Sequence, residues 1–227
     1  MKMQKLGGFS VFAVICLLIV LIVIMVPFST KHGLNEPGAG LDPSKVMAAY
    51  SSSPTTYYVA NTLEILVGIL AFLIILGLYE RMHSKAPNLT RIMIIAASVS
   101  CALSIIGAMI GLRGMALMKD FADVSIYKPI LILQNGLNTA STNISGWILL
   151  LVAFAAISTK ALPRFITYVF LVLGILAVIG FLLPEITGTV GGIISIVVLL
   201  FVVVSYIWLG VVMLKDSSAT SDNPTET

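Results

Sequence analysis

The chain has 227 residues, of which 59% are hydrophobic and 10% are charged, and its mean hydropathy is +1.08. Soluble domains contain about 45–50% apolar and about 25% charged residues, so this chain lacks the polar surface of a water-soluble globule. The net charge of +3 is spread over several loops, which excludes the concentrated basic patch typical of nucleic-acid binding. We therefore expect an all-α polytopic membrane protein that lies in a lipid bilayer and binds no nucleic acid.

The first apolar segment, residues 6–28, follows a short N-terminus that carries two lysines. It is longer than the apolar region of a signal peptide, which has about 7–15 residues and is followed by small residues. Here the segment ends in the sequence Val26-Pro27-Phe28. We expect a retained first membrane span, and a cleaved signal peptide is the alternative.

The polar segment that follows, residues 29–56, contains a signal for the start of a helix. Asp42 is a good capping residue, and Pro43 stands at the position where proline is favoured in a first helical turn. We expect a short extra helix over about residues 43–50, in the first loop outside the membrane. The run of serines before Pro54 is expected to end it.

Five more apolar segments are close to the length of about 20 residues that a membrane crossing needs. The fourth span has an unusually polar start, and we expect its helix to extend over residues 130–137 above the membrane. After the last span, residues 215–227 have the composition of a disordered tail. The expected second to sixth spans are residues 57–79, 89–112, 138–158, 165–183 and 189–214.

Lysine and arginine are denser in the short loops that lie on the same side of the membrane as the N-terminus. Cytoplasmic loops carry the excess of these residues in membrane proteins. We therefore expect both termini of a six-span protein to lie in the cytoplasm, with the chain in the cytoplasmic membrane. The inner basic residues are Lys2, Lys5, Arg81, Lys85, Arg91, Lys160, Arg164 and Lys215, and the outer ones are Lys31, Lys45, Arg113, Lys119 and Lys128.

Glu64 is the one acidic residue inside the expected second span, about two turns from its outer end. A carboxylate at membrane depth is costly, so it usually faces the interior of the helix bundle and has a polar partner. Polar residues of the second, third and fourth spans and of the turn after the fifth span are expected at a similar depth. We predict an outward-facing polar pocket formed by Glu64, Asn61, Arg113, Asn135, Asn138, Thr142 and Glu185.

The fourth span contributes its polar residues to this pocket as one helix face. Asn135, Asn138, Thr142 and Ser145 follow one another at three- and four-residue intervals. In the third span, Gly107 and Gly111 form a Gly-x-x-x-Gly pattern, which lets helix backbones approach closely. We expect that pattern to support packing within the bundle.

The predicted pocket leaves three roles open for Glu64. A buried carboxylic acid can lock helices together through a hydrogen bond, it can contact a ligand or substrate, or it can carry a proton. The corresponding functions are a structural subunit with a membrane-protein partner, a non-enzymatic binding protein for a small or lipidic ligand, and a small secondary transporter.

Recognisable catalytic and metal-binding patterns are absent from the sequence. It contains no H-E-x-x-H, G-x-S-x-G, P-loop or C-x-x-C pattern. Its two cysteines lie within apolar spans, and its two histidines lie in loops expected on opposite sides of the membrane. We expect no enzymatic activity, no metal and no cofactor.

The order of features resembles a prokaryotic family of six-helix integral membrane proteins known only as a domain of unknown function. The similarity lies in the basic N-terminus, the loop helix LDPSKVMAAY at residues 41–50, the early acidic residue of the second span and the turn KALPRF at residues 160–165. It covers about residues 7–214 and implies the six-span fold. Members tend to carry a histidine in the fourth span and an arginine within the third, where this chain has Asn138 and Asn143 and has Arg113 at the span's end.

Overall fold

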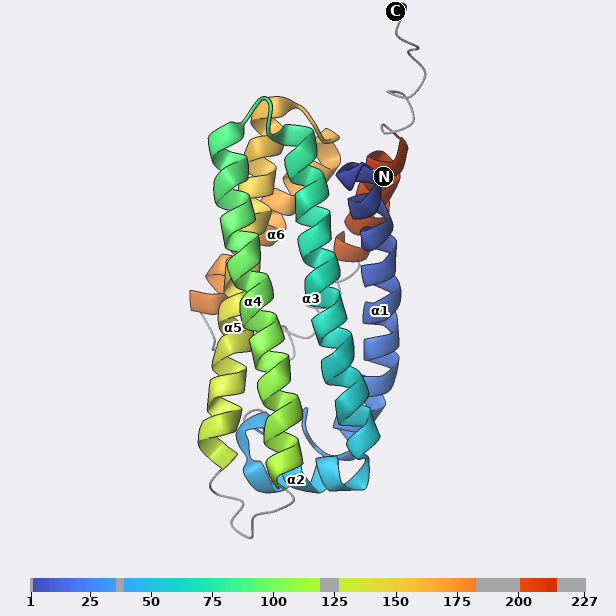
Figure 1. Ribbon diagram of the computed structural model, residues 1–227, viewed down its shortest axis with the longest axis vertical. Helices are drawn as coiled ribbons and strands as arrows, with labels where there is room; N and C mark the ends of the chain where they lie inside the picture. Colours follow the sequence, from blue (N-terminus) through green and yellow to red (C-terminus); the bar gives the residue numbers. More distant parts are fainter. Residues whose placement is uncertain (1, 36–38, 119–126, 183–200, 216–227) are drawn as a thin grey trace, which may run out of the picture. The chain divides into compact units, whose positions relative to one another are not determined.

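The computed structural model describes residues 2–35, 39–118, 127–182 and 201–215, and it contains helices but no strand within these ranges. This confirms the all-α prediction. The helices are α1 (Met3–Lys31), the short 3-10 helix η1 (Ala39–Leu41), α2 (Pro43–Ser52), α3 (Pro54–Met82), α4 (Pro87–Met118), α5 (Lys128–Thr159), α6 (Arg164–Leu182) and a helix over Phe201–Lys215 (Figure 1).

Four of these helices, namely α1, α3, α4 and α5, are long and apolar enough to cross a membrane. They correspond to the first four expected spans. In the described ranges, α6 and the Phe201–Lys215 helix are shorter apolar helices that fall within the expected fifth and sixth spans. The start of the sixth span and the tail over residues 216–227 lie outside the described residues.

The extra helix in the first loop begins where the sequence predicts it. α2 starts at Pro43, and the Asp42 carboxylate accepts hydrogen bonds from the backbone N–H groups of Ser44 at 2.9 Å and Lys45 at 3.4 Å. These contacts satisfy two of the N–H groups that a helix start leaves without a partner. Capping therefore sets this end of α2.

The long helices extend beyond the expected crossings. α4 continues past residue 112 to Met118 and so includes Arg113, which the sequence analysis placed at the end of the third span. The residues after Arg113 include alanine, leucine and methionine. These residues have a high helix propensity, so the helix can continue beyond the length of a membrane crossing. The expected extension of the fourth span is present, because α5 is one helix from Lys128 to Thr159.

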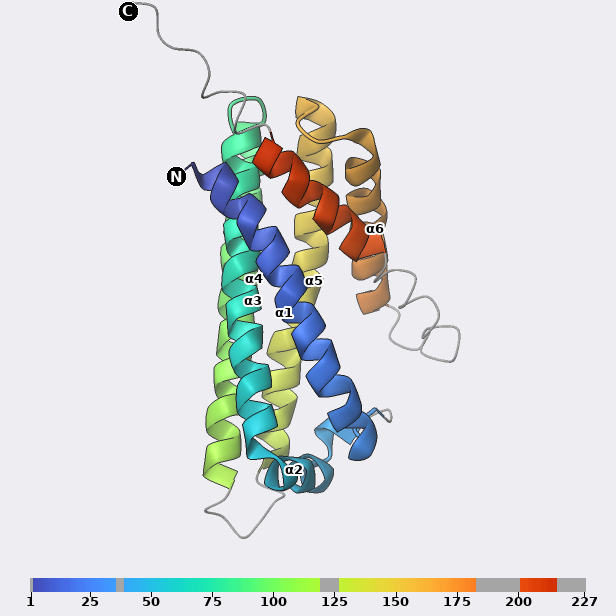
Figure 2. The same ribbon diagram turned by 90° about the vertical axis from the view of Figure 1, so that its right-hand side faces the viewer.

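The chain divides into two compact units, each of which takes parts of the long helices. Unit 1 comprises Met1–Ile15, Leu70–Ser100 and Thr142–Thr227. Its fully buried side chains include Met82, Met93, Ile166 and Met213. In this unit a methyl group added at Gly7 of α1 would lie 2.6 Å from the Met213 Cε. Glycine therefore allows the start of α1 to pack tightly against the end of the Phe201–Lys215 helix, which lies beside it in Figures 1 and 2.

Unit 2 comprises Cys16–Ile69 and Cys101–Ser141. α2 lies across the ends of the long helices of this unit (Figures 1 and 2). Its buried face, Val46 and Tyr50, packs against Tyr127 and Leu131 at the start of α5. The Tyr127 hydroxyl also donates a hydrogen bond to the Leu117 carbonyl at 3.0 Å, which ties the end of α4 to the start of α5.

Candidate functional site

Asn61 and Glu64 lie one helical turn apart on the unit 2 part of α3. The Asn61 side chain is only 6% exposed, and its Nδ2 donates a hydrogen bond to the Tyr57 carbonyl of the same helix at 2.9 Å. Glu64 is half-buried, and within the described part of the chain its carboxylate has no hydrogen bond and no ion pair. The two groups thus present an amide oxygen and a carboxylate at neighbouring positions of one helix.

Gly107 and Gly111 of α4 make room for amide side chains from α3 and α5. A methyl group added at Gly111 would lie 2.5 Å from the Gln134 Nε2 and 2.6 Å from the Asn61 Oδ1. One added at Gly107 would overlap the Asn138 Oδ1. Three amides from two helices therefore lie directly against the glycine face of α4. We call Asn61, Gln134 and Asn138 the amide cluster.

Gln134 is the member of the amide cluster that the sequence analysis missed. The predicted face of α5 contained Asn135, but the structure leaves Asn135 exposed and places Gln134 against Gly111. One feature of the sequence could have identified Gln134. Gln134 and Asn138 are four residues apart, and Gly107 and Gly111 have the same spacing. Side chains four residues apart lie on the same face of a helix and can meet glycines of the same spacing.

The other predicted site residues are not among the side chains nearest to Gly107 and Gly111, or they lie outside the described residues. Arg113 is exposed on α4. Thr142 and Ser145 are exposed residues of unit 1, where the Ser145 and Ser100 hydroxyls lie 3.0 Å apart. Glu185 is not among the described residues. The pocket around Glu64 stays a prediction. Of its residues, the structure brings Asn61 and Asn138 to the face of α4 that carries Gly107 and Gly111.

A crevice next to the amide cluster is lined by aromatic side chains of α2 and α3. It has an empty volume of about 130 Å³ but is too narrow for a water molecule, and its lining residues are Tyr50, Tyr57, Tyr58, Asn61, Gly111 and Leu112. The Tyr50 ring lies 5.7 Å from the Tyr57 ring and 6.4 Å from the Tyr58 ring, in edge-on contacts. Aromatic packing thus lies against Asn61 of the amide cluster on the side of α2.

Tyr50 also forms a hydrogen bond within this aromatic group. Its hydroxyl donates to the Tyr58 hydroxyl at 3.5 Å, and its side chain is 1% exposed. The hydrogen bond and the burial both favour the neutral phenol, and they raise the pKa of Tyr50 to about 12. Tyr50 therefore stays neutral throughout the physiological pH range and acts as a hydrogen-bond donor.

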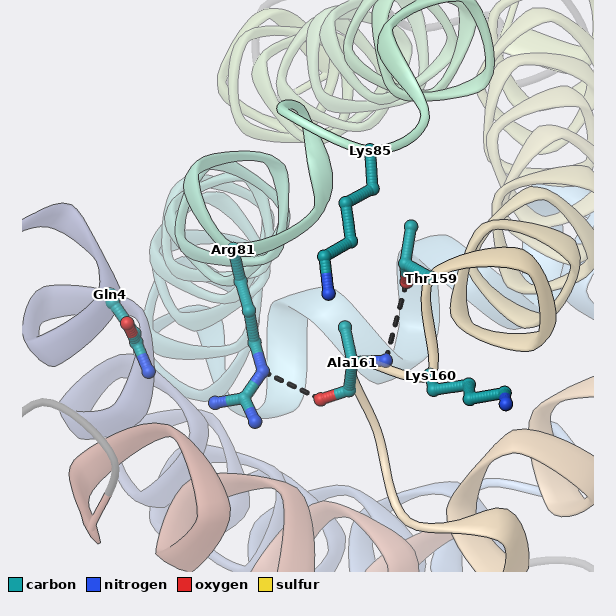
Figure 3. Close-up of a pocket in the computed structure, with 6 residues that line it drawn as sticks. All are labelled: Gln4, Arg81, Lys85, Thr159, Lys160 and Ala161. Atoms are coloured by element: carbon teal, nitrogen blue, oxygen red, sulfur yellow. Dashed lines mark hydrogen bonds between the residues drawn. The ribbon is translucent and has the colours of Figure 1, made fainter.

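A larger cavity lies in unit 1, at the ends of three apolar helices. It has a volume of about 290 Å³ and is lined by Gln4, Arg81, Lys85, Thr159, Lys160 and Ala161 (Figure 3). The sequence analysis used three of these residues only as charges that set the orientation of the chain. The lining of the cavity comes from the starts and ends of helices that are distant in sequence, so no local sequence pattern could identify the cavity.

Metal-ligating side chains do not gather in the described ranges, where no three of His, Cys, Asp and Glu lie close enough to hold a metal ion. The chain matches no known protein family, no characterised protein and no solved structure at a significant level. The fold and site therefore define a helical protein with membrane-length helices, an amide cluster in one unit and a basic cavity in the other.

Proposed function

We propose that this chain is an integral protein of the cytoplasmic membrane that crosses it six times, has both termini in the cytoplasm and binds a small or lipidic ligand without catalysing a reaction. The membrane-length helices support the first part, and α6 and the Phe201–Lys215 helix supply apolar segments for two more crossings. The density of lysine and arginine supports the orientation. Membership of the prokaryotic six-helix family belongs to the same proposal and rests on the sequence features above.

The amide cluster is the observation that carries the binding function. Polar side chains at membrane depth are costly, and they usually either join helices or contact a ligand. The Asn61 hydrogen bond stays within α3, and the Gln134 side chain has no hydrogen bond in the described part of the chain. Neither side chain forms a hydrogen bond that joins two of the described helices. The donors and acceptors that these amides leave unused between helices support the proposed binding of a ligand that supplies both donors and acceptors.

A retained ligand can be detected by native mass spectrometry of the full chain. The chain is purified in mild detergent from the membranes of the cells that produce it. We expect a defined non-protein mass on the wild type and its loss from Gln134→Ala and Glu64→Gln. Asn135→Ala is the matched control, because it removes an exposed amide at the next position of α5. A wild type that never carries such a mass, or variants that keep it, would contradict the binding function. A bound protein mass would support the structural-subunit alternative instead.

Glu64 favours a second candidate function, a small secondary transporter in which this carboxylate is titrated. Carboxylates within membrane-spanning helices commonly mark proton relays and ion pathways, and Glu64 is half-buried without a described partner. Proteoliposomes that contain a pH-sensitive dye and hold a membrane potential would report proton movement. We expect Glu64→Gln to abolish it and Glu80→Gln, which changes the other acidic residue of α3, to leave it intact. Equal flux through wild type and Glu64→Gln excludes this mechanism.

A further inference from the structure

The basic cavity of unit 1 lies where apolar helices end. α1 begins at Met3 next to Gln4, α3 ends at Met82 next to Arg81, and α5 ends at Thr159. The ends of membrane-length helices lie at the level of the lipid headgroups. In the membrane placement proposed above, a cavity at this position faces the phosphate layer of the bilayer as well as the adjoining water.

The lining of the cavity carries more positive than negative charge. Arg81, Lys85 and Lys160 line it, and the ammonium groups of Lys85 and Lys160 make no hydrogen bond or ion pair with the residues that the structure describes. The nearby carboxylate, Glu80, is exposed, does not line the cavity and accepts a hydrogen bond from the Gln4 backbone N–H at 2.7 Å. The cavity is thus suited to an anion.

Figure 3 shows how these side chains lie. The Lys85 side chain points inward and ends between Arg81 and Thr159, and the Gln4 amide faces Arg81 from the other side. The Lys160 side chain extends away from Lys85 and from the other lining side chains. Lys85 and Gln4 therefore supply donors that an anion would contact, and the Arg81 guanidinium adds its positive charge beside them.

The wall of the cavity is held in place by hydrogen bonds. The Arg81 Nε donates to the Ala161 carbonyl at 2.7 Å, and the Ala161 N–H donates to the Thr159 hydroxyl at 3.3 Å. Lys160, between them, has a φ of 53°, in the left-handed region where a residue other than glycine is uncommon. The end of α5 is thus held against α3, and the Arg81 guanidinium is held at the cavity.

We propose that this cavity binds a phosphate group, either of an anionic lipid headgroup or of a small soluble phosphate ester. Arginine and lysine are the usual phosphate-binding side chains, and their hydrogen bonds to phosphate are strengthened by charge. A volume of about 290 Å³ is near the lower end of ligand pockets, which span about 300–1,000 Å³. It suits a phosphate with its attached glycerol better than a nucleotide.

The test measures the thermal stability of the full chain in two arms. In detergent, sodium phosphate and glycerol 3-phosphate are titrated at constant ionic strength, set by sodium chloride. In nanodiscs, phosphatidic acid or phosphatidylglycerol replaces phosphatidylcholine in steps. A bound ligand stabilises the folded state by mass action, so Tm stays constant well below the Kd and then rises with the logarithm of the ligand concentration.

Lys85→Gln is the main variant, because Lys85 is exposed and its loss leaves no described contact unmade. Arg91→Gln is the matched control, since it removes one exposed positive charge of the same unit outside the cavity. We expect Lys85→Gln to weaken the apparent affinity about tenfold, because one charge-assisted hydrogen bond is lost. Arg91→Gln should match the wild type. Arg81→Lys, which keeps the charge but not the planar group, should also weaken binding.

The two arms separate the sources of the phosphate. A rise of Tm with glycerol 3-phosphate in detergent identifies a soluble ester, and a rise only in nanodiscs with an anionic lipid identifies a headgroup. Either result supports the site if it depends on Lys85. Equal losses in Lys85→Gln and Arg91→Gln would mean general charge attraction and would overturn the proposal, as would an unchanged Tm in both arms.

Discussion

Gly111→Ala tests whether the amide cluster lies against α4 as the structure places it. The new methyl group would lie 2.5 Å from the Gln134 Nε2 and 2.6 Å from the Asn61 Oδ1. Comfortable contacts between such atoms are about 3.5 Å, so both side chains or the helix must move by about 1 Å. Asn61 can move only by straining or breaking its hydrogen bond to the Tyr57 carbonyl.

The expected cost follows from these contacts. Inserting a methyl group into a packed site costs about 1–3 kcal/mol, and a strained hydrogen bond adds up to about 1 kcal/mol. Replacing glycine by alanine in a helix contributes about 1 kcal/mol in the opposite direction. Gly136→Ala isolates that gain, because no atom lies within 4 Å of a methyl group at this position of α5. We expect Gly111→Ala to be less stable than Gly136→Ala by about 2 kcal/mol.

Equilibrium unfolding of the full chain in mixed micelles, followed by circular dichroism as dodecyl sulfate is added, measures both variants. The double variant Asn61→Ala, Gly111→Ala should recover about 1 kcal/mol relative to the sum of the single changes, because the colliding oxygen is gone. If Gly111→Ala and Gly136→Ala are equally stable within about 0.5 kcal/mol, or if Asn61→Ala brings no recovery, the packing described for the amide cluster is wrong.

Three further predictions concern capping, titration and an unsatisfied hydroxyl. Asp42→Ala should cost about 0.5–2 kcal/mol, because it removes the cap of α2, and faster hydrogen exchange confined to that helix would verify it. Tyr50 should ionise near pH 12, so the stabilisation from its neutral phenol should be complete below pH 10 and lost as the pH rises from 10 to about 12. Tyr58→Phe should lower that pKa, and the phenolate absorbance near 295 nm gives both values. Ser205→Ala should leave stability unchanged or raise it by up to about 1 kcal/mol in chemical unfolding, because within the described residues the buried Ser205 hydroxyl has no hydrogen-bond partner.

The helices themselves could be predicted from the sequence because their causes are local. In the core of a bilayer, a long apolar run must satisfy its backbone hydrogen bonds within the segment, so it forms a helix. The Asp42-Pro43 pair likewise starts α2 through contacts within three residues. The end of α4 was harder to predict from the length of a membrane crossing. The residues after Arg113 include alanine, leucine and methionine, and their high helix propensity lets the helix continue beyond that length.

The rotation of each helix toward its neighbours was decided by tertiary packing. Gln134 and Asn135 are adjacent amides about 100° apart around α5, and nothing local selects which of them meets α4. The structure selects Gln134 because the backbone can approach only at Gly107 and Gly111. Similarly, the numbers of lysines and arginines in the loops predict which loops lie on the cytoplasmic side. They do not predict which of these charged side chains line the same cavity.

The sequence by itself therefore determined the all-α class, the approximate positions of the described helices and the presence of a carboxylate, Glu64, within a long apolar helix. Tertiary structure alone decided that the amides of α3 and α5 meet at the glycines of α4, and that Arg81 and Lys85 line one cavity with the turn after α5. The physical reason is the distance along the chain over which the interactions act. Helix formation and capping depend on neighbours in the chain, whereas a site depends on contacts between segments that only the folded chain brings together.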